Sequence, residues 1–180
     1  MKKDLSKHLV VPGGINVSLD GTFLKVKGPE GELTKDLKMG KVDLSFKENK
    51  IILERKNATK NEKKIMNTNY SHIQNMIRGV QKKFEYHLKV CYVHFPFTLK
   101  MEGKKVMVKN FLGEKVDRVV DVPEGVEVEL KKEIIIVRSP DKYLAGQASA
   151  NFEAATRVRG RDRRIFQDGI YITEKDGKKI

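Results

Sequence analysis

The sequence has little of what marks secreted and membrane proteins. It contains one cysteine, Cys91, so no disulfide can form within the chain, and a reducing compartment is indicated. No stretch approaches the ~18 consecutive apolar residues that a membrane helix needs. The first ten residues mix lysines with leucines and lack the apolar core of a signal peptide. These absences predict a cytoplasmic protein without membrane contact.

Acidic residues are also scarce relative to basic ones. The 180 residues include 37 Lys and Arg against 24 Asp and Glu, which gives a net charge of +13 at pH 7. Hydrophobic residues make up 39% of the chain, enough for a folded core. A basic surplus of this size predicts a polyanionic partner, and nucleic acid is the default one.

The surplus charge lies mainly in two segments. Residues 54–90 carry +6 and residues 157–180 carry +4, whereas residues 91–156 are neutral. Arginine binds phosphate through two parallel hydrogen bonds and stacks on bases. The last segment also ends in a short lysine-rich tail, which we expect to be disordered without RNA. The predicted nucleic-acid contacts are therefore Arg157, Arg159, Arg161, Arg163, Arg164, Lys175, Lys178 and Lys179.

Signatures of enzymes and metal sites are missing. His87, Cys91 and His94 fall on an expected strand, where His87 and Cys91 would be about 13 Å apart, too far to share a zinc ion. His8 is expected in a mobile N-terminal end. The glycine-rich segments 13–14 and 28–31 lack the downstream Lys-Ser/Thr of a nucleotide-binding loop. The sequence therefore predicts no metal, no cofactor and no catalytic activity.

An internal repeat organises the chain. Moving the sequence by 82 positions aligns Gly21 with Gly103 and Val26 with Val108, and the same offset aligns Lys27, Gly31 and Glu32 with identical residues of the second half. Small changes of this offset elsewhere are typical of insertions in loops. We predict a first module at residues 1–84 and a second at residues 85–180, the latter with the basic C-terminal tail.

Each module is predicted to contain strands followed by one helix. Alternating apolar residues predict strands near 15–19, 23–27, 42–46 and 51–53, and again near 98–101, 105–109, 116–120, 126–130 and 134–137. Helical periodicity follows, from Met66 to Val80 and from Leu144 to Val158. The predicted fold class is α+β, with two similar domains that each combine a small antiparallel β-sheet system with one α-helix.

Capping residues are expected at the ends of both helices. Ser139 precedes Pro140 and Asp141, an order typical of an N-cap hydroxyl followed by a first-turn proline and an acid. Gly79 and Gly160 stand where a left-handed residue would end each helix.

Three motifs, in this order in a duplicated chain, carry a family resemblance. They are the segment Val26-Lys27-Gly28-Pro29-Glu30-Gly31-Glu32-Leu33, the segment Asn110-Phe111-Leu112-Gly113-Glu114-Lys115, and the segment Arg164-Ile165-Phe166-Gln167-Asp168-Gly169-Ile170-Tyr171. With them the sequence resembles the large-subunit ribosomal protein L6 (uL6) family, and the last two look like its archaeal and eukaryotic branch. The resemblance covers about residues 5–176.

The resemblance implies a structural role in the large ribosomal subunit, near the stalk base and the sarcin–ricin region where translation factors dock. It implies large-subunit rRNA and neighbouring ribosomal proteins as partners, with the main rRNA contacts in the second module. Two alternatives stay open at this point. One is a general architectural protein that binds DNA or RNA, and the other is a protein-interaction module that uses the neutral segment 91–156.

Overall fold

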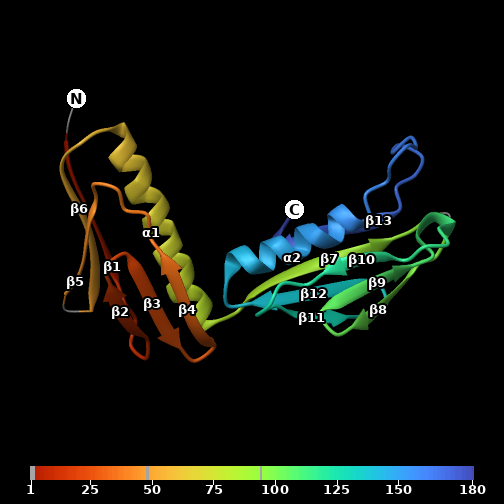
Figure 1. Cartoon of the computed structure of the whole chain (residues 1–180), viewed down its shortest axis with the longest axis horizontal. Helices are drawn as coiled ribbons and strands as arrows, with labels where there is room; N and C mark the ends of the chain where they lie inside the picture. Colours follow the sequence, from red (N-terminus) through yellow and green to blue (C-terminus); the bar gives the residue numbers. More distant parts are fainter. Residues whose placement is uncertain (1–2, 48, 94) are drawn as a thin grey trace. The chain divides into compact units, whose positions relative to one another are not determined.

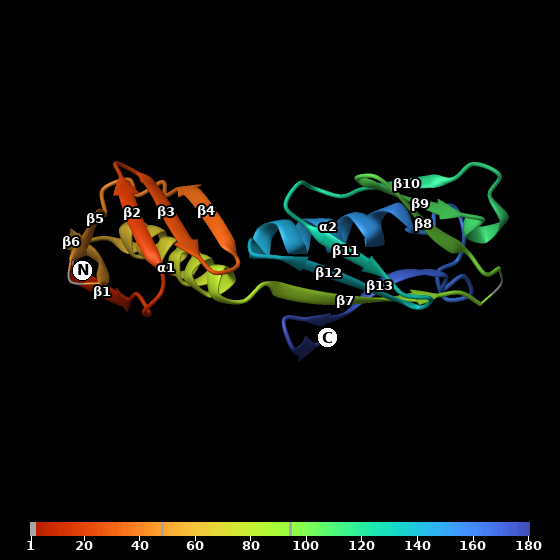
Figure 2. The same cartoon turned by 90° about the horizontal axis from the view of Figure 1, so that it is seen from below.

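The computed structural model describes residues 3–47, 49–93 and 95–180 (Figure 1). The chain divides into two compact units, Met1–Lys83 and Phe84–Ile180. In the described residues each unit packs antiparallel sheets against one α-helix (Figure 2), which confirms the predicted α+β class.

The first unit consists of two three-stranded sheets and helix α1. Their strand orders are β1-β6-β5 and β2-β3-β4, and α1 contacts strands of both sheets. The elements are β1 (Lys3–Val10), β2 (Asn16–Asp20), β3 (Phe23–Gly28), β4 (Gly31–Asp36), β5 (Asp43–Lys47), β6 (Lys50–Ala58) and α1 (Lys60–Gln81).

The second unit repeats this plan and extends it. Its sheets have the orders β10-β9-β8 and β11-β12-β7-β13-β14, and helix α2 contacts both. The elements are β7 (Phe84–Cys91), β8 (Thr98–Glu102), β9 (Lys105–Lys109), a 3-10 turn (Phe111–Gly113), β10 (Arg118–Asp121), β11 (Glu127–Leu130), β12 (Ile134–Ser139), α2 (Lys142–Ala155), β13 (Gly169–Lys175) and β14 (Lys178–Lys179). Strands β13 and β14 have no counterpart among the described strands of the first unit.

Equivalent positions of the repeat occupy equivalent places. Gly21 and Gly103 have left-handed φ angles of 61° and 64° in the turns β2–β3 and β8–β9, a conformation that costs glycine little. Val26 and Val108 are fully buried in β3 and β9, each in the core of its own unit. The repeat therefore reflects two copies of one small core.

The Lys-Gly-Pro-Glu-Gly motif joins the turn β3–β4 to the end of α1. The Glu30 amide donates to the Val80 carbonyl over 2.9 Å, and the Lys83 ammonium lies 3.7 Å from the Glu30 carboxylate. A Cβ atom on Gly28 would lie 2.8 Å from the Val80 carbonyl oxygen and 2.9 Å from the Val80 Cβ. Only glycine allows this close approach, so the motif has a structural role.

Several local expectations were wrong. Asp141, not Ser139, caps α2: the Asp141 carboxylate accepts from the Tyr143 amide over 2.8 Å, while the Ser139 hydroxyl accepts from the Asp141 amide. Gly79 lies inside α1, and Gly160 lies beyond α2, which ends at Ala155. The predicted helix ends at these glycines were wrong because the helical periodicity of apolar residues does not locate the last hydrogen-bonded turn.

The two chain ends are also more regular than predicted. Residues 3–10 form β1, which pairs with β6, so His8 lies in a strand opposite Ile52. The tail is a hairpin in which Lys175 pairs with Lys178 and the Asp176 amide donates to the Glu85 carbonyl over 2.8 Å. The predicted disorder of the tail was therefore wrong, because β7 supplies a pairing partner that is far away in sequence.

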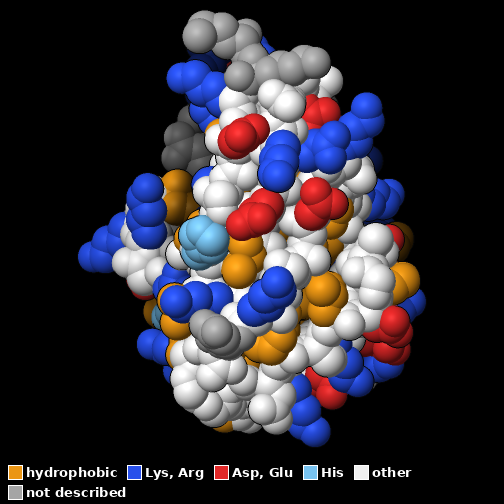
Figure 3. Space-filling view, turned by 90° about the vertical axis from the view of Figure 1, so that its left-hand side faces the viewer, with side chains coloured by type: hydrophobic (Ala, Val, Ile, Leu, Met, Phe, Trp, Pro, Cys, Tyr) orange, Lys and Arg blue, Asp and Glu red, His pale blue; other side chains and the backbone are white. Residues whose placement is uncertain are grey.

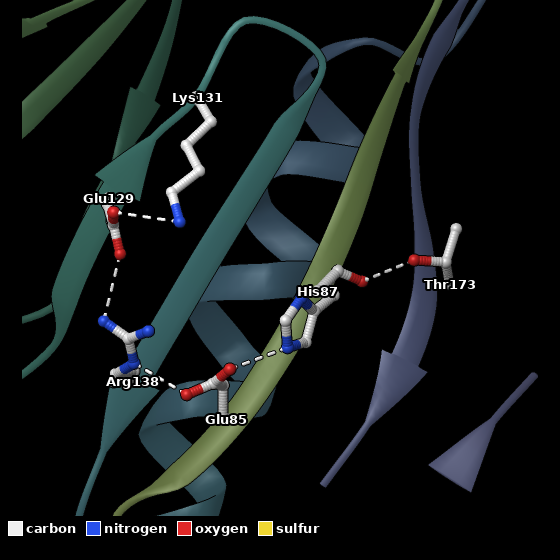
Figure 4. Close-up of polar contacts among 6 residues, drawn as sticks. All are labelled: Glu85, His87, Glu129, Lys131, Arg138 and Thr173. Carbon is white, nitrogen blue, oxygen red and sulfur yellow. Dashed lines mark hydrogen bonds and ion pairs between the residues drawn. The ribbon is translucent and has the colours of Figure 1, made fainter. Parts of the chain in front are cut away.

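A polar network crosses one face of the five-stranded sheet (Figure 4). The Arg138 guanidinium lies between two carboxylates, 2.7 Å from Glu85 and 3.1 Å from Glu129. His87 approaches Glu85 to 2.7 Å, and Lys131 approaches Glu129 to 3.2 Å. The hydrogen bond from Arg138 lowers the pKa of Glu85 below its usual value. The cations and acids on this face of the sheet thus pair with each other.

The close approach of Gly28 to Val80 predicts the effect of an added methyl group. Gly28→Ala should destabilise the first unit by about 1–3 kcal/mol, the usual cost of overpacking. Gly13→Ala is the control, because a Cβ there meets nothing within 4 Å. Chemical denaturation of both variants provides the measurement, and equal effects would contradict the role of the motif.

The pairing of Glu85 with Arg138 predicts a pH dependence. A carboxyl whose folded-state pKa is lowered contributes stability above its unfolded pKa and loses that contribution as the pH falls through the folded value. Glu85→Gln should therefore cost about 0.5 kcal/mol at pH 7, the scale of an exposed ion pair, and less between about pH 5 and pH 3. Urea denaturation at several pH values checks this, with Glu133→Gln as control. The prediction is refuted if the free energy of unfolding of the Glu85 variant falls between pH 5 and pH 3 as steeply as that of the unchanged protein.

Candidate nucleic-acid interface

The five predicted arginines lie on one exposed loop between α2 and β13. We call residues 157–168 the arginine loop. It begins directly after Thr156, the C-cap of α2, and ends where Gly169 starts β13. All five arginine side chains are exposed, and the loop projects from the end of α2 in Figure 1.

The arginines of the loop differ in their partners. Arg164 binds Asp162 over 2.7 Å, which raises the pKa of Arg164 and lowers the pKa of Asp162. The Arg161 guanidinium lies 4.8 Å from the centre of the Phe166 ring. Within the described residues no carboxylate forms an ion pair with Arg157, Arg159, Arg161 or Arg163. Four positive charges on one short loop are thus available to an anion.

Arg118 of β10 holds the start of the arginine loop. Its guanidinium donates to the carbonyl oxygens of Ala155, over 2.8 Å, and Arg157, over 3.1 Å. It also binds the Glu114 carboxylate through two hydrogen bonds of 2.7 and 2.5 Å and stacks 4.3 Å from the Phe111 ring centre. These bonds lower the pKa of Glu114. Arg118 thus supplies a donor that the last carbonyl of α2, at Ala155, lacks within the helix, and it also binds the first carbonyl of the loop.

Thr156, just before the loop, and Asp168, its last residue, hold the two ends of the loop. The buried Asp168 carboxylate accepts from the Val93 amide over 2.7 Å. The buried Thr156 hydroxyl donates to the Phe152 carbonyl and accepts from the Ile170 amide over 2.9 Å. Asp168 thus joins the end of the loop to the segment after β7, and Thr156 joins its start to β13, so both ends of the loop are held.

The tail lysines form a separate basic site. Lys175 ends β13 and Lys178 and Lys179 form β14, whereas the arginine loop precedes the first residue of β13. Seven strand residues at ~3.3 Å each separate Gly169 from Lys175 by roughly 20 Å. The structure therefore brings the five arginines together but does not bring the three lysines to them.

The basic segment of the first unit is also divided. Lys60, Lys63 and Lys64 lie in the first turns of α1, and Arg78 and Lys82 lie at its end. The 22 residues of this helix span roughly 33 Å. Figure 3 shows lysines and arginines on this unit interspersed with acidic and apolar side chains. A single block of charge in the sequence therefore does not form a single patch.

Three contributors to the site were not predicted from the sequence: Arg118, Asp168 as a loop support, and Glu153, whose carboxylate accepts from the Ile172 amide over 3.0 Å. The only available signals were the four-residue spacing of Glu114 and Arg118 and the place of Asp168 in the last motif.

His94, one of the three residues considered for a metal site, lies outside the described residues. In the described part of the chain no group of three His, Cys, Asp or Glu residues could hold a metal, and no helix is long and apolar enough to cross a membrane.

Comparison with known proteins identifies the family. The model of the family described as "Ribosomal protein L6" matches residues 11–83 and 95–169, one match in each unit. A large ribosomal subunit protein uL6 from Methanothrix thermoacetophila is 42% identical over 175 residues, covering 97% of this chain and 99% of the relative. The uL6 protein of Methanococcus vannielii is 41% identical over 176 residues, with coverage of 98% and 97%.

A third uL6 protein, from Saccharolobus solfataricus, is 41% identical over 173 residues and covers 96% of each chain. All three relatives are archaeal, in agreement with the branch that the motifs resemble. With both units matched and nearly the whole length aligned, the chain belongs to the ribosomal protein L6 family and is a structural, non-catalytic constituent of the ribosome.

Proposed function

We propose that this chain binds large-subunit rRNA through the arginine loop and stabilises the folded rRNA near the stalk base and the sarcin–ricin region, where translation factors dock. The observation that carries the proposal is the contrast in charge pairing within the second unit. Lysines of the β8–β10 sheet form ion pairs with acids, such as Lys100 with Glu102 and Lys109 with Asp117, whereas four arginines of the loop form no ion pair with a carboxylate of the described residues.

The geometry favours contact with phosphates and RNA shape. Arginines that bind phosphates position a protein on a nucleic acid and release counterions, without reading the sequence. The deep groove of an RNA helix is closed to side chains, so a loop of this kind would contact phosphates and 2′-hydroxyls. We place the tail lysines Lys175, Lys178 and Lys179 in a second contact, separated from the first by the length of β13. Neighbouring ribosomal proteins and translation factors complete the proposed surroundings in the cytoplasmic ribosome.

A charge reversal tests the arginine loop. The variant Arg161→Glu, Arg163→Glu, Arg164→Glu should fold normally, because its exposed side chains contribute little to stability, but it should fail to enter the large subunit. The salt dependence of its binding to rRNA fragments should be shallower by about 2–3 in the log–log slope, at about 0.9 per lost phosphate contact. Gradient sedimentation of subunits and binding titrations measure these effects.

The matched control reverses Lys104, Lys105 and Lys132, three exposed lysines of the neutral segment, with the same change in net charge. The proposal is refuted if the arginine variant enters the large subunit normally, or if the control variant loses incorporation and rRNA binding to the same extent. Competition between large-subunit rRNA fragments and duplex DNA of arbitrary sequence distinguishes the architectural alternative. That alternative requires comparable affinities for the two, whereas the ribosomal proposal requires preference for one rRNA fragment.

The proposed location is tested by directed cleavage of rRNA. Because Cys91 is the single cysteine, a Cys91→Ser background allows an iron chelate to be attached at Ile165→Cys on the exposed part of the loop. Radicals from this site should cleave rRNA of the sarcin–ricin and stalk-base regions in assembled subunits. A chelate at Met101→Cys in β8 is the control, and cleavage confined to other rRNA regions would contradict the location.

A further inference from the structure

A cavity of about 420 Å³ lies between α2, the arginine loop and β13. Its volume is within the roughly 300–1,000 Å³ typical of small-molecule sites. The small side chains of Ala150 and Ala154 on α2 leave the space open on one side, and Gly169 and Tyr171 of β13 border it on the other. The cavity thus lies directly beside the arginines that we propose to bind rRNA.

Aromatic rings and charged groups line this cavity together. Phe166 and Tyr171 supply two rings, of which Tyr171 is 46% exposed. A Cβ atom on Gly169 would lie 3.2 Å from atoms of the Tyr171 ring, so the glycine lets this ring lie against the backbone. Arg157 and Arg163 line the same cavity, and neither has a carboxylate partner among the described residues. A ligand that fits both the aromatic rings and the arginines needs a flat ring system with negatively charged groups beside it.

A nucleotide has this combination of properties. A base can stack on an aromatic ring, and the phosphates on either side of it can bind arginines. We propose that the cavity holds one unpaired nucleobase of an RNA strand, with its flanking phosphates on Arg157 and Arg163. This inference rests on the proposed function and adds to it a single-stranded feature of the RNA, where base edges are accessible to a protein.

Glu153 gives the cavity a preference among bases. Its Oε1 atom accepts from the Ile172 amide over 3.0 Å, which holds the carboxylate at the wall of the cavity. An ionised carboxylate only accepts hydrogen bonds and has capacity for several, so it favours a base with an exocyclic amino group, such as the N4 amino group of cytosine. Uracil has a carbonyl oxygen in that position. The cavity should therefore bind cytosine more tightly than uracil.

The test compares labelled RNA probes that differ in unpaired bases. Fluorescence anisotropy of the full chain is measured with oligocytidine, oligouridine and a blunt RNA duplex. Ala150→Leu places a larger side chain in the cavity from an exposed helix position and leaves every arginine in place. It should weaken oligocytidine binding at least about tenfold and leave duplex binding within about twofold. Gln147→Leu, on the same helix but outside the cavity, is the matched control.

Two further variants make each outcome decisive. Ala154→Leu fills the cavity from the next turn of α2 and should repeat the effect of Ala150→Leu if either variant folds poorly. Glu153→Gln should bring the affinities for oligocytidine and oligouridine close together. Unchanged oligocytidine binding in both leucine variants would overturn the cavity proposal, as would a parallel loss of duplex binding. If the arginine reversal still abolishes binding to all probes, the proposed function stands even though the cavity proposal fails.

Discussion

The fold depends on one requirement, which is that the last carbonyl groups of each helix receive hydrogen bonds from outside the helix. An α-helix leaves its final carbonyls without partners inside the helix, and burial makes such unpaired groups costly. In the first unit the Glu30 amide binds the Val80 carbonyl, and Gly28 allows the turn β3–β4 to approach closely enough. In the second unit Arg118, at the start of β10, reaches the carbonyls of Ala155 and Arg157. Both copies of the repeat thus complete the helix from a three-stranded sheet, through the turn before β4 in the first unit and through the start of β10 in the second.

The two solutions have different consequences for the chain that follows. A backbone donor requires the turn to pack against α1, and the chain continues from Lys82 and Lys83 directly into β7. In the second unit the long side chain of Arg118 reaches the carbonyls from β10, so the segment after α2 has room to project. Arg118 also keeps its charge neutralised by Glu114. The second copy can therefore hold a loop rich in arginine beside its helix end, whereas the first copy has its basic residues spread along α1.

Much of this architecture follows from local patterns in the sequence. The stripe from Met66 to Val80 predicts α1, and the shared glycines predict equivalent turns, because periodicity and left-handed φ angles depend on the residues themselves. Apart from the misplaced helix caps, the failures share one cause, which is dependence on a distant partner. Strand β1 forms because β6 pairs with it, and the tail becomes a hairpin because β7 and β13 hold it. Likewise, the sequence predicts which loop carries the arginines, but the roles of Arg118 and Glu153 exist only after folding.

A loop that binds RNA must be both charged and ordered, and these demands conflict. Side-chain pairing with acids would order the loop but would neutralise the charge that attracts phosphates. Here the backbone is held instead by Arg118, Thr156 and Asp168, while most of the arginine side chains have no acidic partner in the described chain. Binding of rRNA, as we propose it, would then have to order the arginine side chains but not the loop backbone. Ordering the backbone as well would cost about 1–2 kcal/mol for each residue fixed. If the loop binds rRNA as we propose, these supporting contacts would increase its affinity, because they lower the conformational entropy that binding must remove.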